Sequence, residues 1–354
     1  MNKHIKLPKY IVAAGLLLLG ATSLLAANDP EAEKKKVYSK SYALDGNDKV
    51  SINNQFGEVK ITTWGKSEVK VDITIIGKGS TEEKAQEVLD LISIEDSKSG
   101  GVVSFKTNLK NQHQNWNNDG KKGKNSGMEI NYEVQMPAST ALDLKNSFGK
   151  TWVPDMSGPV EISSKFGELS AGRLGNVKKL EVEFGEATVA SVNNGDVSVK
   201  FSQAQINNMT GTIKTSQSYS GVKFVIDNTI SSLTIKNEFT DLLLDVNTTF
   251  SANFDIYTNF SELKNKTDFK IKEDDEDHSG LKFDHQYSGK SGTGDINVKV
   301  KSNFGDVTVG HNLPFDVNDD KEKAERPERP ERPEKREKRE KKEKTEKKET
   351  ADIS

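Results

Sequence analysis

The chain has 354 residues and a formal net charge of −3, with 30% charged residues, 33% apolar residues and no cysteine. The absence of cysteine excludes disulfides, thiolate metal sites, a thiol nucleophile and the lipid anchor of a lipoprotein. The low apolar fraction is unusual for a compact globule of this length but suits a thin repeat fold, which exposes more surface per residue. Arg173 is the only arginine before residue 326. Because phosphate recognition usually relies on arginine, we expect no nucleic-acid partner.

Residues 1–27 have the pattern of a secretory signal peptide. Lysines at positions 3, 6 and 9 precede an apolar run over 11–25, and the small residues Ala26 and Ala27 follow. The run is shorter than the roughly 20 residues of a membrane-spanning helix, so we expect cleavage after Ala26 or Ala27; the alternative is an uncleaved anchor. The mature protein is then expected in the periplasm, at the cell surface or outside the cell, with no integral membrane segment.

Residues 28–140 are predicted to form a small α+β module with one helix. Apolar and polar residues alternate in several short runs, as in half-buried strands; these runs are 50–52, 59–61, 69–75, 101–107 and 128–136. A helix is expected over about 81–92, where Ser80 and Glu83 fit a capping box and apolar residues recur at helical spacing. Residues 108–127 are expected to form an exposed loop, whose His113 and Trp116 are either a contact site or plain surface.

Residues 141–315 carry a repeat of about 18–22 residues, which is the main signal in the sequence. Each copy has alternating apolar residues, then an aromatic residue, a small residue and usually an acid. The aromatic positions are Phe148, Phe166, Phe184, Phe201, Tyr219, Phe239, Phe260 and Phe304, with one more copy upstream at Phe56. The long gap between Phe260 and Phe304 predicts one irregular or inserted turn around 269–287.

A period of this length predicts one coil of a right-handed parallel β-solenoid, or β-helix. Alternation places every second side chain inside, and the aromatic position is in phase with apolar positions four and six residues before it. We therefore expect the rings to stack inside, about 4.8 Å apart, each buried ring contributing about 1.5–3 kcal/mol. The small residue after the ring is expected to permit positive φ at a tight corner. An antiparallel β-sandwich is the alternative.

Two groups of acidic residues are candidate cation sites. Acids recur two positions after the ring, at Glu58, Glu168, Glu186, Asp241, Glu262 and Asp306; stacked on one edge they would either bind calcium or keep the surface solvated. Residues 273–285 combine acids with histidines, a chemistry suited to zinc or to a solvated insertion. The candidate ligands there are Asp275, Asp277, His278 and His285. Because the acids recur with the repeat instead of gathering at one place, we expect no catalytic residues, and no cofactor.

Residues 316–354 are predicted to be a disordered, charged tail. Three Arg-Pro-Glu units lead into a Lys/Glu-rich run, and a segment with almost no apolar side chains cannot form a core. The tail is either an electrostatic tether to an envelope component or a solvated extension.

The sequence resembles the bacterial putative-adhesin family over roughly residues 40–310. The similar segments are NNQFGEVKITTW at 53–64, EVKVDITIIGKG at 68–79, YEVQMPASTALDLKNSFGKTWV at 132–153 and SNFGDVTV at 302–309. The resemblance implies a β-helical envelope protein and transfers no catalytic residue. The 108–127 segment and the charged tail depart from the family's pattern.

The combined expectation is a non-catalytic, exported cell-envelope protein, an adhesin or scaffold that presents its repeat face to an envelope protein or a glycan. A second hypothesis is an envelope signalling or stress accessory protein that acts through the tail or the 108–127 loop. A third is a carbohydrate-active β-helix enzyme. The sequence does not define the oligomeric state.

Overall fold

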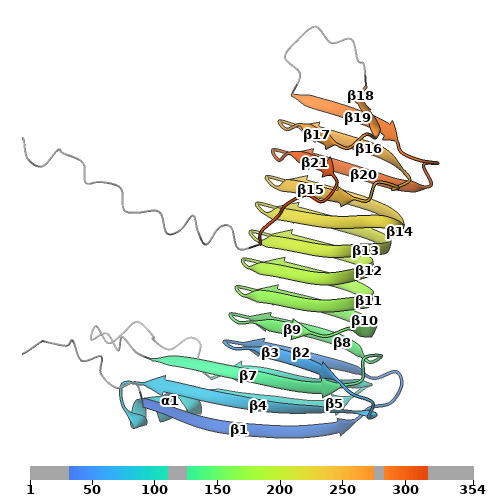
Figure 1. Ribbon diagram of the computed structural model, residues 1–354. Coiled ribbons are helices and arrows are strands. Elements are labelled where there is room, and N and C mark those ends of the chain that lie inside the picture. The colour runs from blue at the N-terminus through green and yellow to red at the C-terminus, as the bar shows by residue number, and fades with distance from the viewer. Residues whose placement is uncertain (1–31, 111–125, 275–282, 318–354) are drawn as a thin grey trace, which may run out of the picture.

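The computed structural model describes residues 32–110, 126–274 and 283–317. These residues form a mainly β structure of 21 strands and one helix, arranged as an elongated column (Figure 1). Several predictions concern residues outside these ranges: the signal peptide, most of the 108–127 loop with His113 and Trp116, the tail beyond residue 317, and the candidate metal ligands Asp275, Asp277 and His278.

The middle of the column is a stack of parallel strands. It consists of β8 (Ala141–Ser147), β9 (Thr151–Val153), β10 (Met156–Lys165), β11 (Glu168–Glu183), β12 (Glu186–Lys200), β13 (Gln203–Ser218), β14 (Gly221–Glu238) and β15 (Asp241–Val246). Each repeat pairs in parallel with the next along the stack. The register aligns equivalent residues, so that Leu169, Ala187 and Ala204 lie side by side and are all buried. Alternation within each repeat therefore builds one continuous apolar core.

The N-terminal end of the column is closed by antiparallel strands and the helix. Its elements are β1 (Ala32–Ala43), β2 (Lys49–Gln55), β3 (Val59–Thr63), β4 (Glu68–Gly79), α1 (Glu82–Asp90), β5 (Ile92–Ser99), β6 (Val102–Leu109) and β7 (Gly127–Met136). Strands β2 and β3 pair in parallel with β8 and β9 on one side and with β6 and β7 on the other. Strand β4 then adds antiparallel to β7, β1 adds antiparallel to β4, and β5 adds antiparallel to β6.

Helix α1 covers β4 at its glycines. A Cβ on Gly77 would lie 2.4 Å from the carbonyl oxygen of Ala85, so glycine permits the close approach. The buried residues of α1 are Ala85, Val88 and Leu89, which belong to the predicted apolar stripe. The N-cap of the helix is one residue later than predicted. The Thr81 hydroxyl, not that of Ser80, accepts a hydrogen bond from the Lys84 N–H. Within the described residues, no helix is long and apolar enough to span a membrane.

The C-terminal end departs from chain order. Its strands are β16 (Ala252–Asn259), β17 (Leu263–Lys266), β18 (Lys270–Glu273), β19 (Asp284–Lys290), β20 (Ile296–Asn303) and β21 (Val307–Gly310). Strand β20 pairs in parallel with both β14 and β16, and β21 pairs in parallel with both β15 and β17. The last repeat in sequence is thus inserted inside the stack, while β19 pairs antiparallel with β16 and β18.

A row of buried, mostly polar side chains lies inside the molecule, next to the corners of the repeats. The residue two positions before the aromatic is buried and often polar: Asn54, Asn146, Ser164, Gln217, Asn237, Thr258 and Ser302. Some of these side chains bind corner carbonyls, as Asn146 Nδ2 does with the Gly57 and Lys150 oxygens at 3.1 Å each. Neither amide atom of Gln217 has a hydrogen-bond partner among the described residues. The interior therefore contains at least one polar group whose burial is unfavourable.

Candidate functional site

Each repeat turns sharply at its aromatic residue. These residues have φ between 48° and 62°, in the left-handed region that favours glycine. They are Phe56, Phe148, Phe166, Phe184, Phe201, Tyr219, Phe239, Phe260 and Phe304. The prediction that the following small residue supplies the positive φ is wrong, because Gly149, Gly167 and Gly185 do not have it. A bulky side chain in this region costs about 1–2 kcal/mol, so every corner is strained.

The small residue after the ring reflects the close approach of successive repeats. A Cβ on Gly149 would lie 1.9 Å from the Gly57 carbonyl oxygen, and a Cβ on Gly167 would lie 1.9 Å from the Gly149 carbonyl oxygen. Where serine replaces glycine, its hydroxyl joins the bonding between repeats: Ser202 Oγ accepts a hydrogen bond from the Gly185 N–H at 3.1 Å. Packing therefore requires glycine at positions 149 and 167, whereas the corner at position 202 accepts a Cβ and uses the serine hydroxyl as a hydrogen-bond acceptor.

The rings lie on the outside of the column. Those of the repeats from Phe148 to Phe304 are 44–55% exposed, so the predicted internal column of rings is wrong. The core is filled instead by residues two, four and six positions before each ring, such as Leu142, Leu144 and Asn146. The physical reason is the corner itself: strict alternation would place the ring inside, but the left-handed conformation breaks the alternation and turns the side chain outward.

The exposed rings form one continuous stack, which we call the aromatic row. In spatial order it contains Phe56, Phe148, Phe166, Phe184, Phe201, Tyr219, Phe239, Phe304, Phe260 and Phe283. Neighbouring ring centroids are 4.7–5.1 Å apart and the planes lie within 5° of each other, except for the last pair at 22°. The inserted repeat places Phe304 between Phe239 and Phe260. Phe283 lies outside the repeat pattern, and no spacing or motif in the sequence indicates its place in the row.

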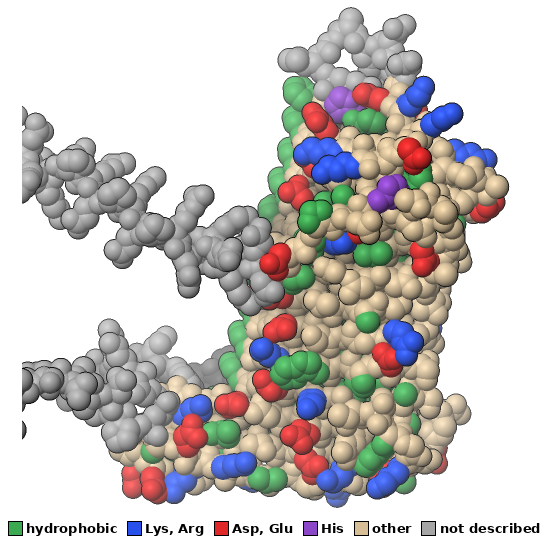
Figure 2. Space-filling model, viewed as in Figure 1, with side chains coloured by type: hydrophobic (Ala, Val, Ile, Leu, Met, Phe, Trp, Pro, Cys, Tyr) green, Lys and Arg blue, Asp and Glu red, His purple; other side chains and the backbone are tan. Residues whose placement is uncertain are grey.

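Stacking determines which part of each ring meets solvent. Because the planes are parallel and close, each inner ring covers the faces of its two neighbours, and its edge is what remains exposed. Figure 2 shows hydrophobic side chains in a line along one edge of the column, with acidic and basic side chains beside it. The row is therefore a narrow apolar ridge of ring edges and offers few ring faces.

An acidic flank follows the aromatic row on one side. The residues two positions after the rings include Glu58, Glu168, Glu186, Asp241, Glu262 and Asp306, which we call the acidic rail; all are partly or fully exposed. Lys150 interrupts the rail and lies 3.2 Å from Glu168. Near the other end, hydrogen bonding from Lys264 holds the pKa of Asp306 below its usual value, although partial burial opposes the shift. The rail is net negative, because the other interruptions, Gln203 and Gly221, are neutral.

Of the two predicted cation sites, the acidic rail lies within the described residues, and the one at 273–285 is only partly described. His285 Nδ1 lies 2.7 Å from Glu273 Oε1, whereas its predicted partners Asp275, Asp277 and His278 fall outside the described ranges. Among described residues, no group of three or more His, Asp or Glu side chains is arranged to hold a metal ion.

Comparison with known proteins gives similarities to solved structures only. No protein-family model and no curated protein matches the chain. A putative adhesin from Bacteroides fragilis is 10% identical, with a TM-score of 0.36, and the match covers 77% of this chain and 97% of that one. A putative adhesin from Parabacteroides distasonis is 9% identical, with a TM-score of 0.32 and the same coverage of 77% and 97%. A putative cell adhesion protein from Clostridium sporogenes is 12% identical, with a TM-score of 0.23, covering 78% and 100%.

The descriptions of these structures agree with the family resemblance named from the sequence.

Proposed function

We propose that this protein is an exported, non-catalytic scaffold of the cell envelope, built as a right-handed parallel β-solenoid, which docks a partner protein along its aromatic row. The observation that carries the proposal is the combination of strain and exposure at the corners. Nine aromatic residues adopt positive φ, and the rings beyond Phe56 remain about half exposed. Glycine would form the same corner without strain. The presence of an aromatic residue at every corner therefore indicates that the ring itself has a role.

Stability alone is a weak reason for retaining the rings. Burying half of a phenylalanine contributes about 0.8–1.5 kcal/mol, and one aromatic stack adds about 0.5–1.5 kcal/mol. Against this stands about 1–2 kcal/mol of backbone strain per corner. Each ring thus contributes between about −0.7 and +2 kcal/mol net, and half of its apolar surface is still available for a partner. A continuous exposed apolar strip of this kind is typical of an interaction surface.

The geometry of the row favours a protein partner. Ring edges fit an apolar groove, whereas a sugar ring stacks on an aromatic face, and here most faces are covered by neighbouring rings. The acidic rail favours a groove with basic residues along one side, since complementary charge fixes orientation and speeds association. The rail also disfavours an anionic membrane surface, which would be repelled by the same carboxylates.

Site-specific photo-crosslinking in the native envelope tests the proposal. A benzoylphenylalanine at position 184, within the row, is expected to give one discrete crosslinked product with an envelope protein. The matched control replaces Lys214, an exposed residue on β13 away from the row, and is expected to give none. Reversing the rail with Glu168→Lys and Glu186→Lys is expected to abolish the product.

Two outcomes would overturn the proposal. Equal crosslinking from positions 184 and 214 would remove the special role of the row. A product containing only a second copy of this chain would replace partner docking by self-association. In either case, unchanged circular dichroism of the variants must first show that the fold is intact.

A further inference from the structure

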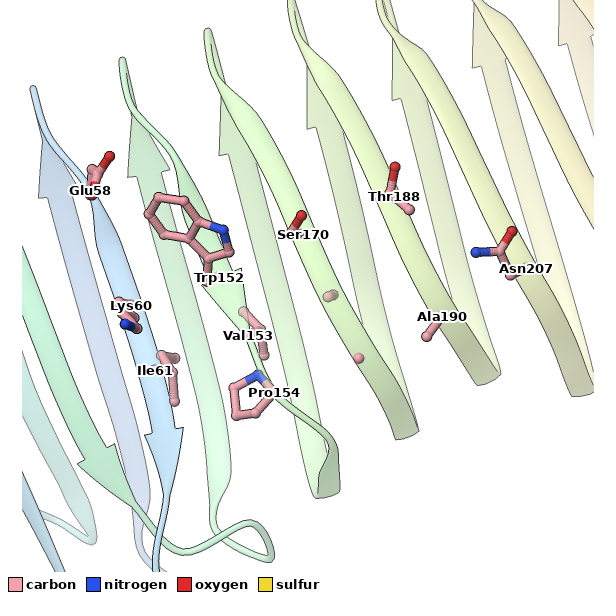
Figure 3. A pocket seen from close by; sticks show the side chains of 12 residues that line it. Glu58, Lys60, Ile61, Trp152, Val153, Pro154, Ser170, Thr188, Ala190 and Asn207 are labelled. Carbon is pink, nitrogen blue, oxygen red and sulfur yellow. The ribbon is translucent and has the colours of Figure 1, made fainter. Parts of the chain in front are cut away.

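A groove lies beside the aromatic row, on the outer face of the strands that follow the corners. It has a volume of about 640 Å³, is open to solvent, and is lined by residues of β3, β9, β11, β12 and β13 together with the segment after β9. Figure 3 shows the Trp152 indole toward one side, with Ser170, Thr188 and Asn207 on the strands beyond it. We call this the Trp152 groove.

The sequence explains why the surface is hollow here. In the outward-facing register, Lys60, Trp152, Ser170 and Thr188 occupy equivalent positions on successive strands. The large Trp152 side chain forms a wall, and the small side chains of Ser170 and Thr188 on the next two strands form a low floor beside it. Further along the column, Lys223 occupies the equivalent position. Alternation and the repeat period do not single out Trp152, because it stands at an outward position.

The floor is small and largely uncharged. Ala171, Gly172 and Ala190 line it beside the hydroxyl-bearing Ser170 and Thr188. Glycine is required at position 172, where a Cβ would lie 2.4 Å from the Asp155 carboxylate. Because these side chains are small, a ligand can lie close to the strands, where several hydrogen-bonding groups are available.

The Trp152 side chain lies partly against the surface of the column and beside one lysine. It is partly buried, and Lys150 Nζ lies 5.9 Å from its ring centroid. The same lysine is held 3.2 Å from Glu168. Unlike the rings of the aromatic row, the indole has no ring stacked on it among the described aromatic contacts. A partly exposed indole without a stacked ring is a suitable platform for a flat apolar ligand surface.

We propose that the Trp152 groove binds a neutral oligosaccharide. One sugar ring would pack its C–H face on the Trp152 indole, and its hydroxyls would exchange hydrogen bonds with Ser170, Thr188 and the Asn207 amide. This combination of an apolar wall with a few placed polar groups is the usual composition of a ligand site. From β9 to β13 the groove crosses three interstrand steps, or about 14 Å, which suits a short chain of sugars better than a single one.

The charge of the groove separates this ligand class from others. The charged residues among those lining it are Glu58 and Lys60, which have opposite signs and lie at one end. The acidic rail borders the groove, with Glu168 and Glu186 two positions before Ser170 and Thr188, so an anionic ligand is disfavoured, while the floor itself offers no carboxylate to hold a cation. The groove contains no arginine to grip phosphate. It is open to solvent, which is unfavourable for a lipid tail. Hydroxyl-rich, uncharged molecules with apolar faces match all of these features.

Ligand-observed saturation-transfer NMR on the full chain provides the test. The probes are cellotetraose, chitotetraose and maltotetraose, with tetragalacturonate as the charged comparison, each titrated to roughly 10 mM. At least one neutral tetrasaccharide is expected to bind, and Trp152→Ala is expected to weaken its binding at least tenfold. Thr188→Val, which keeps the shape but removes the hydroxyl, is expected to weaken it about threefold to tenfold.

Two controls separate this site from the rest of the molecule. Trp64→Phe changes a tryptophan whose indole donates to the Glu68 carbonyl outside the groove, and Phe184→Ser changes the aromatic row; neither is expected to alter saccharide binding. The inference is overturned if no neutral tetrasaccharide binds, if Trp152→Ala binds as well as the original chain, or if tetragalacturonate binds more tightly than every neutral probe. Equal thermal stability of the Trp152→Ala variant excludes unfolding as the cause of a loss.

Discussion

The outward position of Phe166 leads to an unusual order of stability between two substitutions. We expect Phe166→Gly to be more stable than Phe166→Ala, although glycine normally weakens a strand by about 0.5–1 kcal/mol relative to alanine. The reason is the φ of 54° at this corner, which glycine adopts freely and alanine does not.

The magnitudes follow from the exposure and stacking of the ring. Phe166 is 47% exposed, so removing it loses about 0.8–1.5 kcal/mol of burial. Its two stacks, with Phe148 and Phe184, add about 0.5 kcal/mol each, the low end for such pairs. No buried cavity forms at a surface position, so Phe166→Ala should lose about 2 kcal/mol instead of the 3–5 kcal/mol of a buried ring. Glycine also relieves about 1–2 kcal/mol of strain, partly offset by about 0.4–1 kcal/mol of extra freedom in the unfolded chain.

Urea denaturation of both variants, followed by circular dichroism, measures the difference. The free energy of unfolding should be greater for glycine than for alanine at position 166, by about 0.8 kcal/mol at the centre of a range that extends to about 1.6 kcal/mol. Glu161 is the matched control, because it is exposed in the middle of β10 just before the same corner; there, alanine should be more stable than glycine. If alanine is the more stable residue at both positions, or if Phe166→Ala loses more than about 3 kcal/mol, the strained, outward corner is refuted.

Three further substitutions test the packing and charge of the column. Gly167→Ala should lose more than about 2 kcal/mol in urea denaturation, because its Cβ would meet the Gly149 carbonyl oxygen at 1.9 Å. Gln217→Val should raise the melting temperature and stabilise by about 1 kcal/mol, since it removes a buried amide without partners among the described residues. The pKa of Asp306 is lowered by Lys264, so its contribution to stability is present above the unfolded-state pKa and is lost as the pH falls through the folded-state value; Asp306→Asn should flatten the acid limb of a stability-versus-pH curve.

Each of these substitutions has a comparison that isolates its cause. Ser202→Ala keeps a Cβ at the equivalent corner and removes only a hydroxyl, so it should lose about 1 kcal/mol; an equal loss at 167 and 202 would contradict the close-approach argument. A destabilised Gln217→Val protein would show that the amide is satisfied by bound water. An acid limb that is identical with and without the Asp306 carboxylate would show that its pairing with Lys264 does not contribute.

The parallel pairing of the repeats followed from the sequence because alternation and period are local properties of the chain. The direction of the rings did not follow, because it depends on one backbone angle at each corner. Phe166 and Phe184 are in phase with buried residues, and only their positive φ turns them outward. The glycine that often follows the ring led to the wrong prediction of which residue has positive φ. Glycine also occurs where two backbones approach closely, and that is its role here.

The spatial order of the repeats could not be predicted from the sequence either. Repeats of similar sequence present similar edges to one another, so nothing local specifies that β20 pairs between β14 and β16. The long gap before Phe304 did indicate an irregular segment, and the structure fills part of it with the antiparallel strand β19. Trp152 was missed for a different reason: it breaks no pattern at an outward position, and its surroundings become a groove only when the small residues of neighbouring strands are brought beside it.

The insertion of residues 296–310 has a consequence for synthesis. A ribosome delivers the chain from its amino end, so this segment arrives after both of its eventual neighbours. Until it does, the position between Phe239 and Phe260 lacks the ring of Phe304 that joins them. A nascent or truncated chain would therefore present two shorter ridges, and the proposed partner would meet the full length of the aromatic row only on finished molecules.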